Sequence, residues 1–309
     1  MIHTVFTAGL PIGESLVVRK NRITGISKRG PRVAVVTGMH GDELEGQYVA
    51  FELARRLNER IEELVGIVDI YPALNPLGLS SHLHGVPTFD IDLDRTFPGN
   101  AHGNLTDALA AAVLDDIKGA QACVVIHSSN ASVDEVTQVR IDETNPNRLL
   151  KLASLLNARL VWVRPPTPQL ETTLAHALNQ LRTPTLVVEM GAGMRLTESS
   201  GAWLVEGILR LLEHLGAWTG PTIFLPAPLV SDGSNVVAIS SDTAGIFIPY
   251  VENGSDVTQG QLLGIVADPL SGTVVQEVKA PRDGLLFTLR AYPATYPGSL
   301  LARILEVAS

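Results

Sequence analysis

Short apolar runs alternate with segments of helical periodicity over the first 220 residues of the chain. The run at residues 32–38 is rich in β-branched residues and ends at a glycine, as is typical of a buried strand. Apolar residues then recur at helical spacing from Leu44 to Leu57. Further strands are predicted at residues 65–76, 122–127, 159–164 and 185–191, and further helices at 105–118, 145–158, 170–182 and 198–215.

Strands that alternate with helices predict an α/β sheet with helices on both faces. In such sheets the functional groups gather at the carboxyl ends of the strands. His40 follows the first strand, His127 ends the strand at residues 122–127, and Glu189 lies near the end of the strand at residues 185–191. We therefore expect these three side chains to meet at one edge of the sheet.

Two stretches depart from the alternation. Residues 76–104 are rich in Gly, Pro and Asp and predict a long ordered loop, a feature that is often functional in compact domains. After about residue 220, short apolar runs are separated by Gly, Pro and Asp turns. This pattern predicts two domains, an α/β catalytic domain at residues 1–220 and a small all-β domain at residues 221–309.

Composition narrows the functional classes. The 309 residues are 45% hydrophobic and carry a formal net charge of −9 without a Lys/Arg cluster, which argues against a nucleic-acid partner. The single cysteine, Cys123, cannot form an internal disulfide, and we expect it to be a small buried residue. We find neither a signal-peptide pattern nor a membrane-spanning apolar run, so a cytoplasmic protein is expected. A homodimer is the commonest state of such enzymes.

The segment GMHGDELEG places His40 and Glu43 three residues apart. If a helix begins near Asp42, both side chains can converge on one zinc ion, and His127 is placed to complete a catalytic set of three ligands. The alternative is the start of a surface helix. His82 and His84 form a second possible metal pair, although loop positions are the simpler interpretation.

Glu189 lies in an otherwise apolar strand. One interpretation is a carboxylate at a strand end that points to solvent. The functional interpretation is a general base whose pKa is raised by apolar neighbours. Its position beside the predicted metal ligands favours the second.

At GMHGDELEG the chain resembles the succinylglutamate desuccinylase/aspartoacylase family, relatives of the zinc carboxypeptidases, whose motif is G-x-H-G-[DN]-E. Four further motifs follow in the family's order, and together the resemblance covers roughly residues 30–215. It implies a carboxypeptidase-like mixed sheet, one Zn²⁺ per chain held by His40, Glu43 and His127, and Glu189 as general base and acid. The four further motifs are NPLG at 75–78, DLDRTFPG at 92–99, IHSSN at 126–130 and VEMG at 188–191.

Three features qualify the resemblance. Residues 245–289 are similar to a biotinyl/lipoyl-type barrel-sandwich, but the lysine-bearing hairpin is not recognisable, so we expect this domain to shape the active site. Asp94 stands where the family has Asn, which weakens carboxylate binding beside Arg95 and favours a substrate with an amine. The arginine that relatives place before this motif is missing. Arg95, Arg140, His82 or His84 could replace it at the oxyanion, although a solvated Arg140 is the simpler alternative.

The sequence thus predicts a zinc-dependent hydrolase that cleaves an amide bond of a small N-acylated amino acid or related amine. Glu189 and Arg95 are the predicted catalytic residues, and Asp94, Arg95 and Arg140 the predicted substrate contacts. A peptide-cleaving zinc carboxypeptidase and a non-catalytic zinc-binding module are the alternatives. The predicted partner is a small-molecule substrate rather than nucleic acid or membrane.

Overall fold

The computed structural model describes residues 1–27, 29–87, 90–142, 146–223 and 226–307. Its central feature is one large mixed sheet with the strand order β1-β2-β4-β3-β5-β8-β6. The strands β4, β3, β5 and β8 run parallel, while β2 and β6 flank them antiparallel. The strands of this region are β1 (Ile2–Gly9), β2 (Ser15–Thr24), β3 (Arg32–Val36), β4 (Ile67–Tyr71), β5 (Ala122–Ser129), β6 (Val133–Ile141), β7 (Leu160–Val163), β8 (Thr185–Ala192) and β9 (Leu229–Ser231).

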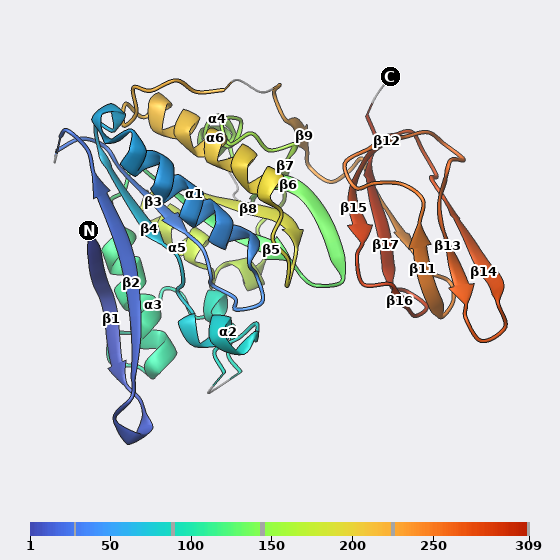
Figure 1. Cartoon of the computed structure of the whole chain (residues 1–309), viewed down its shortest axis with the longest axis horizontal. Helices are drawn as coiled ribbons and strands as arrows, with labels where there is room; N and C mark the ends of the chain where they lie inside the picture. Colours follow the sequence, from blue (N-terminus) through green and yellow to red (C-terminus); the bar gives the residue numbers. More distant parts are fainter. Residues whose placement is uncertain (28, 88–89, 143–145, 224–225, 308–309) are drawn as a thin grey trace.

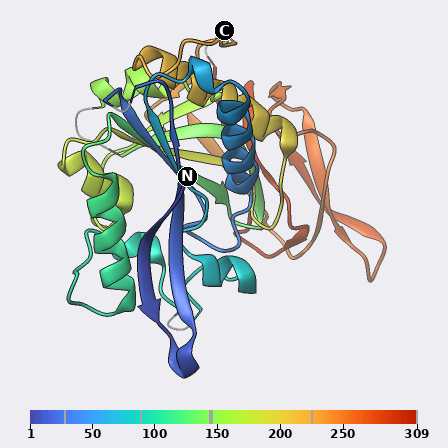
Figure 2. The same ribbon diagram turned by 60° about the vertical axis from the view of Figure 1, so that its left-hand side comes forward.

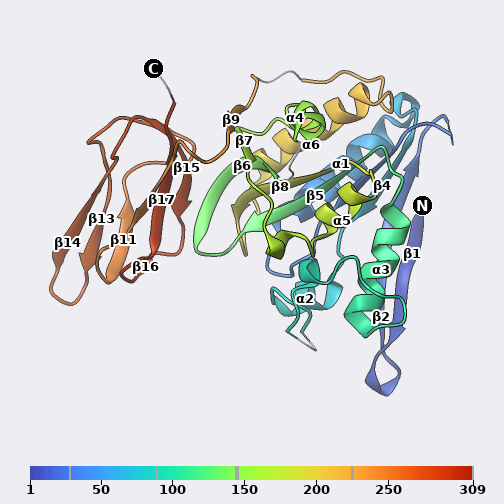
Figure 3. The same cartoon turned by 180° about the vertical axis from the view of Figure 1, so that it is seen from behind.

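Helices cover both faces of the sheet (Figures 1 and 3). One apolar core lies under α1, α4 and α6, and a second lies under α3 and α5 on the opposite face. From Val33 to Val36, successive residues of β3 alternate between the two cores and are all apolar, as expected for a parallel strand buried on both sides. The helices are α1 (Glu45–Glu59), α2 (Pro76–Ser81), α3 (Leu105–Ile117), α4 (Asn147–Ala153), α5 (Leu174–Gln180) and α6 (Glu198–His214).

The predicted fold class is confirmed, with corrections to single elements. The helix expected at Leu44–Leu57 spans Glu45–Glu59 and so begins three residues after Asp42. The loop expected at residues 76–104 contains α2 and a 3₁₀ turn at Leu93–Arg95, and its residues 88 and 89 lie outside the described part of the chain. The helix expected at residues 145–158 is shorter, and residue 145 lies outside the described part of the chain. Within the described ranges, no helix combines the length and apolar character needed to cross a membrane.

The C-terminal region is a two-layered β-structure, and it is helix-free within its described residues, as expected (Figure 1). One layer contains β15, β17 and β10, with β12 against β15, and the other has the order β14-β13-β11-β16. Apolar side chains from both layers, among them Phe247, Leu263 and Leu286, form its core. The strands are β10 (Val236–Ser240), β11 (Gly245–Pro249), β12 (Asp256–Val257), β13 (Leu262–Asp268), β14 (Thr273–Lys279), β15 (Gly284–Arg290), β16 (Ala294–Thr295) and β17 (Leu300–Leu305).

The two regions are joined by backbone pairing between β6 and β15. Glu135 lies opposite Thr288, and Val133 lies opposite Arg290, so the large sheet continues into the C-terminal layer. In Figure 2 the orange and red strands of the C-terminal region lie beside the green strands of the large sheet. The predicted boundary at residue 220 stays a prediction.

A buried ion cluster stabilises the opposite part of the sheet, among β2, β3, β4 and α3. The Asp69 carboxylate accepts hydrogen bonds from Arg22 at 2.7 and 2.6 Å, and Lys20 and Arg32 each approach it at 3.4 Å. Lys20 also contacts Asp116 at 2.7 Å. Burial alone would raise the pKa of Asp69, but the Arg22 hydrogen bonds and the neighbouring positive charges together lower it below its ordinary value.

Asp69→Asn is expected to lower the free energy of unfolding by about 3 to 5 kcal/mol at pH 7, because it removes the buried carboxylate that Arg22, Arg32 and Lys20 share and leaves Asp116 as the remaining carboxylate on Lys20. The contribution of Asp69 is present above its unfolded-state pKa of about 3.9 and is lost as the pH falls through its lower folded-state pKa. Urea unfolding of both proteins at pH 7 and in acid measures this difference. A difference of the same size at both pH values would contradict the assignment.

Candidate active site

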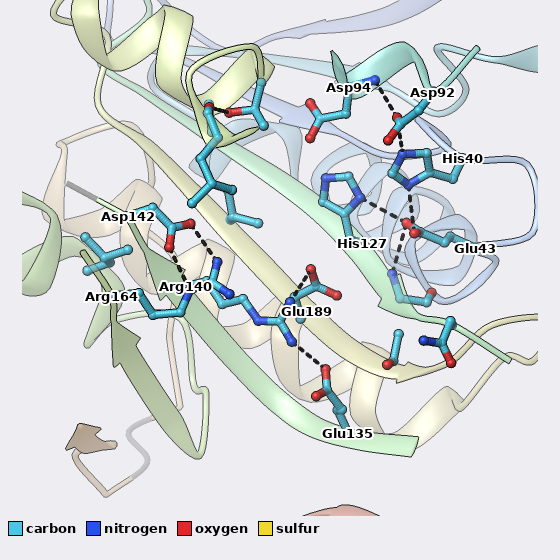
Figure 4. A pocket seen from close by; sticks show the side chains of 18 of the residues that line it. His40, Glu43, Asp92, Asp94, His127, Glu135, Arg140, Asp142, Arg164 and Glu189 are labelled. Carbon is cyan, nitrogen blue, oxygen red and sulfur yellow. Dashed lines mark hydrogen bonds and ion pairs between the residues drawn. The ribbon is translucent and has the colours of Figure 1, made fainter. Parts of the chain in front are cut away.

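Three buried side chains converge at the carboxyl ends of β3 and β5 (Figure 4). His40 and Glu43 lie in the turn between β3 and α1, and His127 lies on β5. His40 Nδ1 is 2.7 Å from Glu43 Oε1, and His127 Nδ1 is 3.0 Å from Glu43 Oε2. The backbone N–H of Ser128 also donates to Glu43 Oε2 at 3.2 Å, which fixes the carboxylate between the two rings.

Glycines make this turn possible. Gly38 has a φ of +62°, and a Cβ there would lie 2.7 Å from the carbonyl oxygen of Pro72. Gly41 packs directly on α2, where a Cβ would lie 1.9 Å from the backbone carbon of Gly78. The backbone N–H of Gly41 donates to the carbonyl of Leu83 at 3.0 Å. The segment that contains α2 and Leu83 thus packs against the turn that carries His40 and Glu43.

Asp92 orients His40 from the outer side of the ring. Its Oδ1 lies 2.9 Å from His40 Nε2 and also accepts the backbone N–H of Asp94 at 2.9 Å. A carboxylate that holds the far nitrogen of a histidine in this way is a common second partner in metal sites, where it fixes the ring orientation. Sequence reasoning missed this contact, although Asp92 begins the DLDR motif.

The electrostatics of the cluster suit a cation. Burial lowers the pKa of His40, but the contacts with Asp92 and Glu43 outweigh it and raise the pKa to about 10. Burial raises the pKa of Glu43, but His127 and His40 lower it to about 2. The ligand atoms of His40, Glu43 and His127 lie within 4.8 Å of one another. Two imidazole nitrogens and a carboxylate oxygen fit the donor set of a catalytic zinc site.

Glu189 lies beside this cluster, on the neighbouring strand β8. It is the register partner of His127, and paired positions on adjacent strands lie about 4.8 Å apart with side chains on the same face. Its side chain is only 16% exposed, so the alternative of a solvated carboxylate is wrong. Burial raises the pKa of Glu189, although the positive charges of Arg140 and His127 act in the opposite direction.

Arg140 reaches Glu189 from β6. Its Nη1 donates to Glu189 Oε1 at 2.9 Å, and its Nη2 donates to Glu135 Oε2 at 2.8 Å (Figure 4). The side chain is 17% exposed, so the alternative of a solvated arginine is also wrong. A direct contact between Arg140 and substrate stays a prediction. Sequence reasoning did not include Glu135, whose acidic side chain lies in a polar stretch of β6 without a recognisable motif.

Asp94 and Arg95 enter the site from the 3₁₀ turn at Leu93–Arg95. Asp94 is buried, and its Oδ1 accepts the backbone N–H of Leu174 at 3.1 Å. Burial raises the pKa of Asp94, against the influence of nearby positive groups, including His127. Arg95 is 46% exposed, with its Nε 3.4 Å from Asp92 Oδ2 and its Nη1 donating to the Gln169 carbonyl.

His84 and His82 differ in their relation to the site. The His84 ring stacks on His40 with centroids 3.8 Å apart, and its Nδ1 lies 3.0 Å from Asp42 Oδ1. His82 is exposed and ends α2 with a φ of +59°. Of the two histidines weighed as substitutes for the missing arginine, His84 is the one that lines the site.

All the predicted site residues line one cavity of about 660 Å³. His40, Glu43 and His127 form one side of it, and Glu189, Arg140 and Glu135 form another (Figure 4). The C-terminal region contributes Arg290, Leu300 and Arg303 to the wall. The cavity is therefore closed partly by the second β-structure, and its size suits a small molecule.

Solved structures share this fold. A succinylglutamate desuccinylase from Silicibacter sp. TM1040 superposes with a TM-score of 0.81 at 22% identity, over 99% of this chain and 95% of that chain. The product-bound ectoine utilization protein EutE (DoeB) from Ruegeria pomeroyi gives a TM-score of 0.80 at 21% identity, with the same coverage. At these identities the likeness establishes the architecture of both regions.

Sequence comparisons identify the family. The chain is 28% identical over 295 residues to an N-alpha-acetyl-L-2,4-diaminobutyric acid deacetylase from Halomonas elongata. The alignment covers 90% of this chain and 83% of that relative. Residues 29–215 match the model of the succinylglutamate desuccinylase/aspartoacylase catalytic domain. This segment is more than half of the chain and contains His40, Glu43, His127 and Glu189. The chain belongs to the succinylglutamate desuccinylase/aspartoacylase family.

Proposed function

We propose that this protein is a zinc-dependent deacylase that hydrolyses the amide bond of a small N-acylated amino acid. The observation that carries the proposal is the convergence of two buried histidines, a buried carboxylate and a separate, partly buried glutamate in one cavity. Membership of a deacylase family supports the reaction class. A structural metal site would not need Glu189, so the non-catalytic module is the weaker alternative.

His40, Glu43 and His127 are the residues that would hold the metal, with Asp92 fixing the His40 ring. When bound, Zn²⁺ supplies Lewis-acid polarisation of the scissile carbonyl and lowers the pKa of a water to about 7. Glu189 Oε1 accepts the hydrogen bond from Arg140, so we assign the proton transfers to Oε2. That oxygen removes a proton from the attacking water and later delivers it to the leaving amine.

The tetrahedral oxyanion requires a cationic or hydrogen-bonding partner, and removal of one such donor typically lowers the rate by about 10²- to 10³-fold. Arg95 is our proposal for this role, since it lines the cavity and keeps an exposed guanidinium. Both terminal nitrogens of Arg140 already bond to glutamates. Each of these nitrogens carries a second hydrogen, so a contact between Arg140 and the substrate remains part of the proposal.

Asp94 favours a substrate that carries an additional amino group. Among the described residues, its Oδ1 is the oxygen that accepts a hydrogen bond, which leaves Oδ2 for a cationic ligand. A buried carboxylate without an arginine or lysine bonded to it attracts an ammonium group and repels a carboxylate. The diaminobutyrate named for the relative from Halomonas elongata has such a second amine. We therefore propose an N-acetylated diamino acid as the substrate class.

Asp94→Asn is expected to lower kcat/KM for Nα-acetyl-2,4-diaminobutyrate by about 10- to 100-fold, because a hydrogen bond to a charged group is lost. The matched substrate is Nα-acetyl-2-aminobutyrate, which lacks only the terminal amine and should be affected much less. Steady-state kinetics on both substrates give the specificity ratio. An equal loss on both substrates would assign Asp94 to a general structural role.

The proposed reaction is tested directly by incubating the zinc-loaded protein with N-acyl amino acids and following the released carboxylate by NMR, which is acetate for the N-acetyl substrates. Release that stops with a chelator and returns with zinc supports the deacylase. Cleavage of C-terminal residues from peptides at higher kcat/KM would favour the carboxypeptidase alternative. Zinc binding without turnover of either class would leave the non-catalytic module.

A further inference from the structure

Glu135 occupies the junction between the two regions of the protein. It lies on β6, at the position paired with Thr288 of β15, and its side chain is only 1% exposed. Oε2 accepts Arg140 Nη2 at 2.8 Å, while Oε1 accepts Arg303 Nη1 at 3.0 Å and Thr288 Oγ1 at 3.2 Å. A buried carboxylate with three side-chain donors is a fixed group.

These contacts form a continuous path from the C-terminal region to the predicted general base. Thr288 and Arg303 are themselves cross-strand partners on β15 and β17, so both donors reach Glu135 from one rigid ladder. Glu135 then holds one terminal nitrogen of Arg140, and the other terminal nitrogen holds Glu189 Oε1 (Figure 4).

The path restricts the position of Arg140. Its guanidinium is planar, so fixing Nη2 on Glu135 also fixes the direction in which Nη1 donates to Glu189. Without Glu135, Glu189 would be the one carboxylate among the described residues that is hydrogen-bonded to Arg140, and the guanidinium could turn about that single contact. Proton transfer requires Glu189 Oε2 to keep a defined place, and a displacement of about 1 Å in such a group can cost 10²-fold in rate.

We propose that Glu135 is a positioning residue, which fixes Arg140 on Glu189 and couples the orientation of the general base to the C-terminal β-structure. The inference rests on the proposed function, because it assigns a role to a residue that does not touch the scissile bond. Glu135 itself acts only through Arg140, and its charge also compensates the half-buried Arg303.

The test is steady-state kinetics of Glu135→Gln on the same N-acetyl diamino acid, with zinc content measured for each protein. We expect kcat to fall by about 10- to 100-fold while KM changes by less than about threefold and one zinc per chain remains. Glu206→Gln is the matched control, because Glu206 is also a buried glutamate paired with an arginine, Arg56, but lies outside the cavity lining. Its kcat should equal that of the wild type.

A double-mutant cycle with Arg140→Lys separates positioning from general stability. If Glu135 acts through Arg140, the two losses in kcat are far from additive. The double substitution Thr288→Val with Arg303→Met removes the two donors to Glu135 Oε1 and keeps the Glu135 charge. It should lower kcat several-fold. If Glu135→Gln does not fold, the kcat of this double variant tests the positioning role instead.

An unchanged kcat, a loss confined to KM or zinc content, or additive losses in the cycle would overturn the positioning role. These outcomes differ from failure of the proposed function, in which the wild-type protein itself would release no acetate. In that case there is no wild-type kcat with which to compare the variants, and the positioning role of Glu135 is rejected together with the proposed function.

Discussion

Replacing Glu189 by glutamine is expected to lower kcat by about 10²- to 10⁴-fold while the protein keeps one zinc per chain. Glutamine has nearly the same shape as glutamate and can still accept the hydrogen bond that Arg140 donates to Oε1. It cannot take a proton from water at neutral pH, so the loss isolates the acid–base chemistry. Steady-state kinetics combined with metal analysis checks both parts of the expectation.

Asp142→Asn is a suitable control for this substitution. Asp142 lines the same cavity, is 16% exposed like Glu189, and pairs with a different arginine, Arg164, at 2.7 Å. We expect its kcat to stay within a few-fold of the wild-type value. A Glu189→Gln protein that turns over substrate at the wild-type rate would remove Glu189 from the mechanism, and a loss of zinc in that variant would move Glu189 to the metal site.

Replacing His127 by alanine is expected to remove the bound zinc and reduce deacylase activity to background. Catalytic zinc sites use three protein ligands, and this substitution leaves only His40 and Glu43. Glu43 also loses the partner that lies 3.0 Å from its Oε2. Metal analysis of the purified protein after zinc addition measures the loss, and kinetics on the same sample shows whether turnover falls in proportion.

His84→Ala distinguishes this ligand set from its neighbours. Within the described part of the chain, two other groups of side chains have metal-ligand spacing, one with His40, His84 and Asp92 and one with Asp42, Glu43 and His84. Both include His84, whose side chain is 51% exposed, whereas the set with His127 is buried throughout. We expect His84→Ala to retain zinc. A protein that keeps zinc without His127 and loses it without His84 would reverse the assignment.

The architecture of the large sheet could be predicted well because its parallel strands are apolar on both faces. Arg32–Val36 and Ala122–Ser129 are buried throughout or nearly so, and such runs are easily recognised in a sequence. The hairpin of β1 and β2 was not predicted. β1 alternates between exposed and half-buried positions, and β2 carries charged residues, including the buried Lys20, among its apolar ones. β6 was also missed. Its polar side chains, such as Glu135 and Arg140, line the cavity, and in the sequence they look like the polar residues of a solvent-exposed segment.

The candidate site was predictable where a motif carries it. His40, Glu43 and His127 meet as expected, and Glu189 is their neighbour in register. The contacts that depend on long-range packing were not predictable. Glu135 reaches Arg303 across 168 positions of sequence, and no local pattern indicates such a pair. Asp92 could have been found, because it begins a motif whose other members were already assigned to the site.

The pairing of β6 with β15 limits how domains can be exchanged between relatives. Side chains alternate between the two faces of a strand, so a slip of one residue in this pairing would turn Thr288 to the opposite face. Arg303 would be displaced together with Thr288, because the two residues are paired across β15 and β17. A chimera that receives a foreign C-terminal domain must therefore keep the linker length and the register of β15 against β6, so that hydrogen-bond donors still reach Glu135. Changes at the distant β13–β14 hairpin leave that register unchanged.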